Sequence, residues 1–174
     1  MLQLFIWMVK ISITIHGLKH RFVMLPSLIG ADLIEEQDYI YIQKNGPGHE
    51  ISFVTFENVK VVGFNTGVYL IALKPQSGYS YINANSFDKL VIDDCVNCIR
   101  LISAETVPNE CSGNTFKSLQ IQTSTATNIL ITNGQYNEFD GMVWDLSNIP
   151  HNRSIVQLTN TLNILFMLLA LEWL

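Results

Sequence analysis

The sequence predicts an all-β fold: a single-stranded, right-handed parallel β-helix, or solenoid, of about four rungs. Three observations carry this prediction. An internal repeat runs through the middle of the chain, alternating apolar residues mark two short strands in each copy, and helical spacing is almost absent between residues 38 and 148. A chain of 174 residues is long enough to bury a sizeable core in one such domain.

The repeat consists of the phrase F-x-x-φ-x-φ, a short turn and then φ-x-φ, where φ is an apolar residue. Two segments with a period of two residues predict two strands per copy, because alternate side chains of a strand face the same way. The copies begin 31, 29 and 23 residues apart, at Phe56, Phe87, Phe116 and Phe139. Stacked turns lie about 4.8 Å apart, so these rings are predicted to form one interior column. In the fourth copy, Met142 and Trp144 are expected at the apolar positions that follow the phenylalanine.

Three copies carry an asparagine two residues before the phenylalanine, at Asn85, Asn114 and Asn137. An asparagine at a tight turn tolerates left-handed backbone geometry and hydrogen-bonds to nearby backbone. Stacked asparagines also satisfy turn groups that would otherwise be buried unpaired, so the sequence predicts an amide ladder. The alternative is a row of amides that contacts sugars.

These Asn-x-Phe phrases, with their stacked Ile, Leu and Val columns, resemble the right-handed parallel β-helices of the pectate-lyase-like superfamily. That superfamily includes polysaccharide lyases, polygalacturonases, epimerases and bacteriophage tailspikes. The resemblance covers about residues 38–148 and lies in the fold pattern. It implies a polysaccharide or surface glycan as partner, and an extracellular, cell-surface or virion location.

The composition excludes one class of function. The net charge is −5 and no long basic run is present, whereas binding to a nucleic acid backbone needs clustered Lys and Arg. We therefore expect no nucleic acid partner. Hydrophobic content of 48% with 14% charged residues suits many buried strands or a membrane contact.

The cysteines are predicted to be buried. Cys95 and Cys98 have the CxxC spacing of redox and zinc sites, but Cys111 is the only further cysteine. A structural zinc site needs four ligands, usually from two such pairs. We expect no metal and no cofactor.

The two ends are predicted separately from the rungs. Residues 1–37 are expected to form irregular N-terminal strands or a cap, and residues 149–174 an apolar tail. The run 162–174 is too short and interrupted for a convincing membrane span. A helix, membrane contact and the truncated end of a longer chain are all open for this tail. A last rung with an unpaired edge leads us to expect a homotrimer or a continuation of the solenoid.

One set of candidate residues is catalytic. Asp93, Asp94 and Arg100 imitate the acidic ion site and catalytic arginine of calcium-dependent pectate lyases, as the resemblance implies. Other polygalacturonase phrases are absent; only the Asp93-Asp94 pair matches in letters. Hydrolysis of a glycosidic bond needs two carboxylates about 5–10 Å apart. Acidic residues also keep the outside of a solenoid soluble, which is the alternative role of this pair.

A second set of candidates is for substrate binding, because sugars stack on aromatic rings and hydrogen-bond to carboxylates and amides. The repeat predicts an outward row that begins at Glu57. The insertion 74–81 breaks a rung and is expected to form a lip over a groove. The candidate binding residues from the row and the lip are Tyr79, Tyr81, Asp88, Lys117 and Asp140.

The predicted function is a structural, carbohydrate-interacting β-helix module of a virion or cell-surface type, without a clear catalytic signature. The first alternative is a polysaccharide lyase or glycoside hydrolase that uses the aspartate pair. The second alternative is a small membrane-associated protein, based on the apolar ends.

Overall fold

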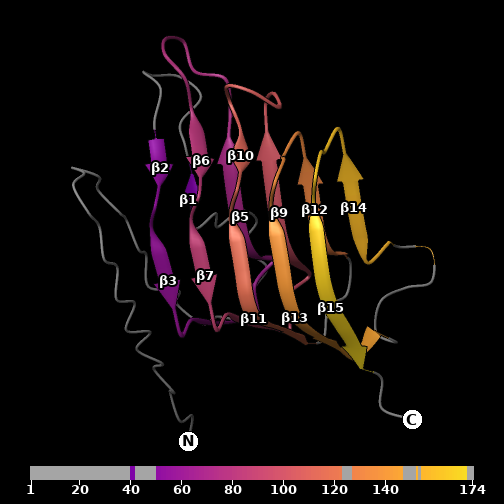
Figure 1. Cartoon of the computed structure of the whole chain (residues 1–174). Coiled ribbons are helices and arrows are strands. Elements are labelled where there is room, and N and C mark those ends of the chain that lie inside the picture. Colours follow the sequence, from indigo (N-terminus) through magenta and orange to yellow (C-terminus); the bar gives the residue numbers. More distant parts are fainter. Residues whose placement is uncertain (1–39, 42–49, 123–126, 147–151, 153, 172–174) are drawn as a thin grey trace, which may run out of the picture.

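The computed structural model describes residues 40–41, 50–122, 127–146, 152 and 154–171, and it confirms the predicted fold class. The chain forms a parallel β-solenoid of about four turns, and every regular element within the described residues is a strand (Figure 1). Residues 1–37, predicted as a cap, lie outside the described part. Among the described residues, no helix is long and apolar enough to cross a membrane.

The strands stack into three parallel sheets. The long sheet contains β3 (Thr55–Glu57), β7 (Ser86–Asp88), β11 (Thr115–Gln122), β13 (Glu138–Trp144) and β15 (Leu165–Leu171), with β4 (Lys60–Val62) and β8 (Val91–Asp93) joined to it. The back sheet contains β1 (Ile40–Tyr41), β5 (Thr66–Ala72), β9 (Asn97–Ser103), β12 (Thr127–Thr132) and β14 (Val156–Thr159). The short sheet contains β2 (Glu50–Ser52), β6 (Tyr81–Asn83) and β10 (Cys111–Ser112), and it lies above the long sheet in Figure 1.

The predicted phenylalanine column is present and has one more member. Neighbouring rings are stacked nearly parallel, with centroids 4.7, 4.6 and 4.8 Å apart from Phe56 to Phe139. Phe166 in β15 adds a fifth ring, 5.1 Å from that of Phe139. Each ring covers the face of the next, so the column excludes water along the length of the core.

The amide ladder is also confirmed. Asn85 donates from its backbone N–H and from Nδ2 to Oδ1 of Asn114, over 3.1 and 3.0 Å. Asn114 makes the same two bonds to Oδ1 of Asn137, over 3.0 and 3.1 Å. All three side chains are buried, and each Nδ2 also donates to a backbone carbonyl, that of Ile51, Ile82 or Cys111.

The left-handed corner residues are not these asparagines but the residues immediately before them. The first corner of successive turns has φ between 51° and 65°, at Phe53, Ala84, Gly113, Tyr136 and Asn163. Left-handed geometry costs a non-glycine residue roughly 1–2 kcal/mol. The N–H groups of the first four of these corners donate to carbonyls of the next turn; that of Ala84, for example, donates to the carbonyl of Ser112 over 3.0 Å. The corner therefore bends the chain without leaving backbone groups unpaired.

The prediction for the fourth copy is wrong by one residue. Gly141 and Val143, not Met142 and Trp144, pair with the interior positions Leu119 and Ile121, so Met142 and Trp144 fall on the outward side. The cause is a shorter copy in β13. Ser118, with a φ of 53°, is the left-handed corner residue that Asn58 and Lys89 form in the earlier turns, and β13 has one residue fewer between Phe139 and Gly141. Met142 and Trp144 keep the apolar spacing of the earlier copies, so the apolar pattern does not reveal the missing corner residue.

The apolar tail, for which a helix was one open possibility, forms strands where the structure describes it. Within residues 149–174 the described elements are β14 and β15, which continue the back and long sheets in register with β12 and β13. The alternation Ile164, Phe166, Leu168 packs against the core, while Leu165, Met167 and Leu169 face outward and are exposed. Apolar residues on both sides of a strand hide its period of two, which is why the sequence pattern was ambiguous.

Candidate functional site

The structure places the predicted catalytic residues on different parts of the solenoid. Asp93 ends β8 on the long sheet, where a carboxylate oxygen lies 3.6 Å from Nζ of Lys60. Asp94 is a left-handed corner residue, with a φ of 52°. Arg100 lies in β9 on the back sheet, and its guanidinium stacks over the Tyr69 ring, 5.0 Å from the centroid. Asp93 and Arg100 therefore belong to different sheets, and Asp94 lies at the corner between their strands.

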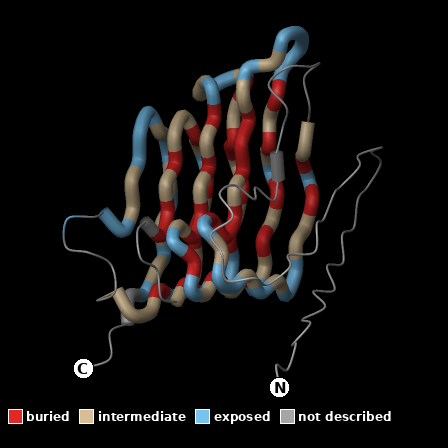
Figure 2. Tube along the Cα trace, turned by 180° about the vertical axis from the view of Figure 1, so that it is seen from behind, coloured by how far each residue is buried: buried red, intermediate tan, exposed pale blue. Residues whose placement is uncertain are grey.

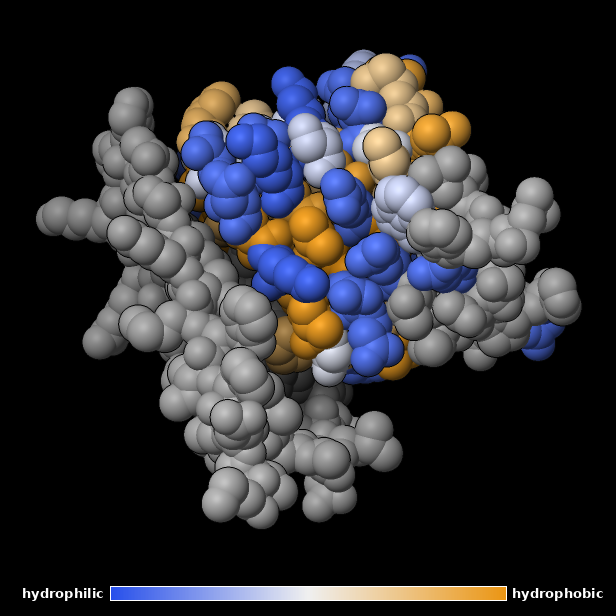
Figure 3. Space-filling view, turned by 90° about the horizontal axis from the view of Figure 1, so that it is seen from below, coloured by the Kyte–Doolittle hydropathy of each residue, from blue (hydrophilic) through white to orange (hydrophobic). Residues whose placement is uncertain are grey.

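The outward row of the long sheet is present in part. Glu57 pairs in register with Asp88, and Asp88 pairs with Lys117. Asp140 pairs with Met167, but the register shift in β11 leaves it without a direct register partner in that strand. The underside of the molecule, beyond this row, shows hydrophilic residues around a smaller apolar area (Figure 3). The row is charged and solvent-facing, which also fits a solubilising role.

The two predicted tyrosines lie at the other end of the turn, with the short sheet. Tyr79 is 62% exposed in the segment that leads into β6. Tyr81 is the first residue of β6, in register with Glu50 of β2. A hydrogen bond to the Glu50 carboxylate, helped by desolvation, raises the pKa of the Tyr81 hydroxyl above its usual value. The tyrosines thus flank a surface that the sequence analysis did not single out.

That surface, which we call the short-sheet face, is the outward side of β2, β6 and β10. Along each strand, a polar residue stands on either side of one apolar residue that points inward. These inward residues are Ile51, Ile82 and Cys111, and the polar residues before and after them form two rows. We take the short-sheet face to include also Glu110, just before β10, and Gln135 of the next turn. Its residues are Glu50, Ser52, Tyr81, Asn83, Glu110, Ser112 and Gln135, of which Ser52 and Ser112 are buried.

The carboxylate of Glu110 is the centre of the hydrogen bonds on this face. It accepts from Asn83 Nδ2 over 3.3 Å, from Ser112 Oγ over 2.6 Å and from Gln135 Nε2 over 3.3 Å. Asn83 Oδ1 accepts from the backbone N–H of Ser112 over 3.0 Å. These four hydrogen bonds hold the side chains in one arrangement. Asn83, Glu110 and Gln135 are nevertheless only partly buried.

Sequence reasoning missed this face, although a signal for it exists. The triplets Glu50-Ile51-Ser52, Tyr81-Ile82-Asn83 and Glu110-Cys111-Ser112 are 31 and 29 residues apart, the same offsets as the first three phenylalanines. Each triplet has a polar, apolar, polar pattern typical of a short half-buried strand. Applying the offset upstream of the phenylalanine would have found them.

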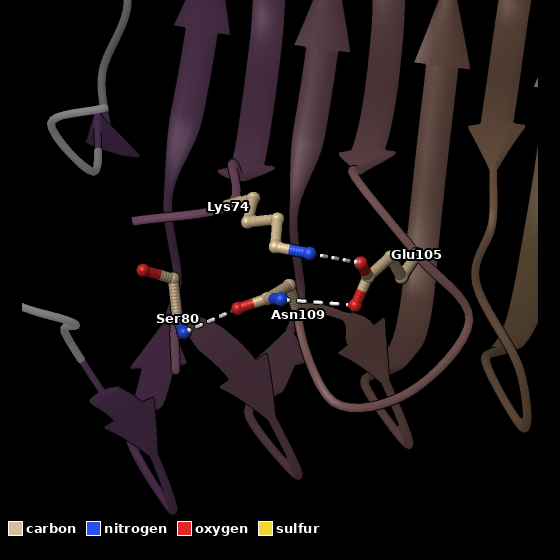
Figure 4. A network of polar contacts seen from close by, with 4 residues as sticks. All are labelled: Lys74, Ser80, Glu105 and Asn109. Carbon is tan, nitrogen blue, oxygen red and sulfur yellow. Dashed lines mark hydrogen bonds and ion pairs between the residues drawn. The ribbon is translucent and has the colours of Figure 1, made fainter. Parts of the chain in front are cut away.

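A second polar network joins the segment between β5 and β6 to the segment between β9 and β10 (Figure 4). Lys74 Nζ donates to Oε1 of Glu105 over 3.1 Å, and Asn109 Nδ2 donates to Oε2 of Glu105 over 3.0 Å. The buried Asn109 accepts from the backbone N–H of Ser80 over 2.9 Å. The bonds from Lys74 and Asn109 lower the pKa of Glu105. This network joins the segment between β5 and β6, which carries Tyr79, to the segment that follows β9.

The cysteines are free thiols in the interior, as predicted. Burial raises the pKa of the Cys111 thiol to about 12 and also raises that of Cys95. Cys95 and Cys98 lie at interior positions of the corner and of β9. Within the described residues, no group of three or more His, Cys, Asp and Glu side chains could hold a metal ion.

A scan of family models, a search of curated proteins and a search of solved structures each gave no match to this chain.

Proposed function

We propose that this protein is a structural β-solenoid that binds a polysaccharide or surface glycan on its short-sheet face. The observation that supports the proposal is the hydrogen-bonded arrangement around Glu110, with Asn83 and Ser112 held beside it. Sugars present vicinal hydroxyl groups that both donate and accept, and a carboxylate beside an amide matches both roles.

The spacing of the rungs adds a second argument. Equivalent side chains of Glu50, Tyr81 and Glu110 recur at successive turns, about 4.8 Å apart. A polymer that lies along the solenoid axis therefore meets a carboxylate, a phenol and a second carboxylate at successive turns. Repeated weak contacts along one chain raise the overall affinity without any single strong contact.

Aromatic surface beside the polar rows completes the chemistry of a sugar site. Tyr79 offers an exposed ring, and Tyr81 carries a second ring at the first position of β6, in register with Glu50 of β2. Sugar rings stack on aromatic faces through their axial C–H groups, while the hydroxyls at the ring edge reach polar neighbours. The Lys74–Glu105–Asn109 network limits the movement of the loop that carries Tyr79.

The test is a glycan array followed by titration of the array hit. Glu110→Gln keeps the size of the side chain but removes its charge, and we expect at least a tenfold loss of affinity because charge-assisted hydrogen bonds contribute about 1.5–3 kcal/mol each. Asp88→Asn on the long sheet is the matched control and leaves affinity unchanged. Binding that survives Glu110→Gln but is lost in Asp88→Asn would move the site to the long sheet. An array without any hit would contradict the proposal.

The enzymatic alternative rests on the aspartate pair and has its own test. Release of reducing ends or unsaturated uronides from a polysaccharide panel, lost in Asp94→Asn with folding intact, would establish catalysis. Because Arg100 lies on another sheet from Asp93, we propose binding in preference to turnover.

A further inference from the structure

The last turn of the described solenoid is unusual in its exposed surface. Half or nearly half of the surface of each of five large apolar side chains is exposed there, between 45% and 57%: Leu158, Leu162, Leu165, Met167 and Leu169. Seen from behind, this turn is intermediate or exposed over most of its length, whereas the central turns are largely buried (Figure 2). Interior positions are affected too, because Leu158 aligns with the buried Ile131.

The backbone of this turn is also open on one side. β15 is the end strand of the long sheet and pairs with β13 over seven residues, Leu165 to Leu171. β14 is likewise the end strand of the back sheet. Among the described strands, none pairs with the outer edge of β15. An edge strand of this length offers a row of N–H and C=O groups to any second strand.

The exposed edge of β15 lacks the charged residues and prolines that usually prevent two edge strands from pairing. Residues 154–171 contain no charged residue and no proline. Natural sheets protect their edges with charges, especially lysine, and with proline or bulges. Since the whole chain carries a net charge of −5, an uncharged end is where two copies approach with the least repulsion.

The opposite end of the long sheet has a different surface, which decides how two copies meet. There β3 ends with the exposed Glu57, and β4 begins with the exposed Lys60. Through the successive registers, Lys60 stands in the same row as Leu169. Head-to-tail stacking would therefore set apolar side chains against these charges, which would lose hydration without gaining a partner.

We propose that β15 of one copy pairs antiparallel with β15 of a second copy, giving a two-fold, end-to-end dimer. A two-fold interface brings the same patch of both subunits together, so apolar residues meet apolar residues. The long sheet then runs continuously through both copies, and the half-buried Phe166 and Leu168 are covered by the second core. Both the unpaired backbone and the exposed apolar rows are satisfied by one contact.

The mass of the full chain in solution, measured by light scattering across a concentration series, tests the dimer first. We expect a mass about twice that of the 19.7 kDa chain. A mass that stays at that of one chain, a trimer, or a polymer that grows with concentration would each overturn the proposal. A polymer would indicate head-to-tail stacking, and a trimer would indicate side-by-side assembly.

Two variants then test the place of contact. Leu169→Lys and Met167→Lys each put a charge on an outward, half-exposed position, so folding should persist while the charge enters the apolar contact with the second copy. We expect each to halve the mass at concentrations where the unmodified chain is dimeric, with an unchanged circular dichroism spectrum. Val62→Lys, at a 46% exposed position on the opposite end strand, is the control and should stay dimeric. A folded Leu169→Lys that remains dimeric would refute the contact through β15.

Discussion

The asparagine ladder should be the most sensitive part of the core, and Asn114→Ala tests it. The amide of Asn114 accepts two hydrogen bonds from Asn85, at 3.1 and 3.0 Å, and donates two, to the carbonyl of Ile82 at 2.9 Å and to Oδ1 of Asn137 at 3.1 Å. Replacement by alanine removes all four.

Not every partner loses its only bond. Asn85 Nδ2 still donates to the carbonyl of Ile51, and Asn137 Oδ1 still accepts from the backbone N–H of residue 114. The buried N–H of Asn85 and the carbonyl of Ile82 lose the amide as a partner. At about 1–3 kcal/mol for each buried group left unsatisfied, the loss is about 4 kcal/mol. That is a large share of the roughly 5–15 kcal/mol that stabilises an ordinary domain.

Urea denaturation followed by circular dichroism measures this loss. Asp88→Ala, on the outward row of the long sheet, is the control and should change the free energy of unfolding by less than about 0.5 kcal/mol. A destabilisation below about 1 kcal/mol for Asn114→Ala would refute the reasoning, because the four bonds would then have no net value in the fold.

Three further predictions follow from the packing and the charges. Phe116→Ala should lower the free energy of unfolding by about 3–5 kcal/mol in the same denaturation assay, because it leaves a gap in the middle of the stacked rings; a loss below about 1 kcal/mol would contradict the column. The three cysteines should not react with a thiol reagent at pH 8 until the protein unfolds, and the burial that raises the pKa of Cys111 to about 12 should make stability fall as pH rises above the range in which an unfolded thiol ionises; fast labelling of the native protein would show the thiols to be accessible. Lys74→Met should raise the pKa of Glu105 toward its ordinary value in an NMR titration, since the hydrogen bond from Lys74 is the main cause of the lowering; an unchanged titration would mean that Asn109 alone sets it.

The solenoid could be predicted from the sequence because its interior repeats. The phenylalanines and the asparagines before them recur at fixed offsets, and such positions are constrained by stacking in every turn. The register of Phe56 with Phe87 and of Phe87 with Phe116 is as predicted. The shorter fourth copy in β13 was not predictable, because Met142 and Trp144 keep the apolar spacing of the earlier copies although Gly141 and Val143 take the interior positions.

The candidate site was predicted only in part, for a different physical reason. Outward residues are free to vary from turn to turn, so no periodic pattern identifies which of them act together. Tyr79 and Tyr81 were singled out as ring-bearing loop residues, but Glu110 and Asn83 were not, since their contact depends on side-chain orientation across neighbouring turns. Likewise, the sequence shows Asp93, Asp94 and Arg100 close together along the chain but does not show that a corner places Asp93 and Arg100 on different sheets.

Amide chemical-shift mapping with the glycan that the array selects tests the proposed function most directly. The account predicts that titration shifts the amides of residues 50–52, 81–83 and 110–112, in the three strands of the short sheet. Glu110→Gln should weaken these shifts at equal glycan concentration, while Asp88→Asn should not. Shifts confined to the long-sheet row of Glu57, Asp88 and Lys117, or no shifts at saturating glycan, would contradict it.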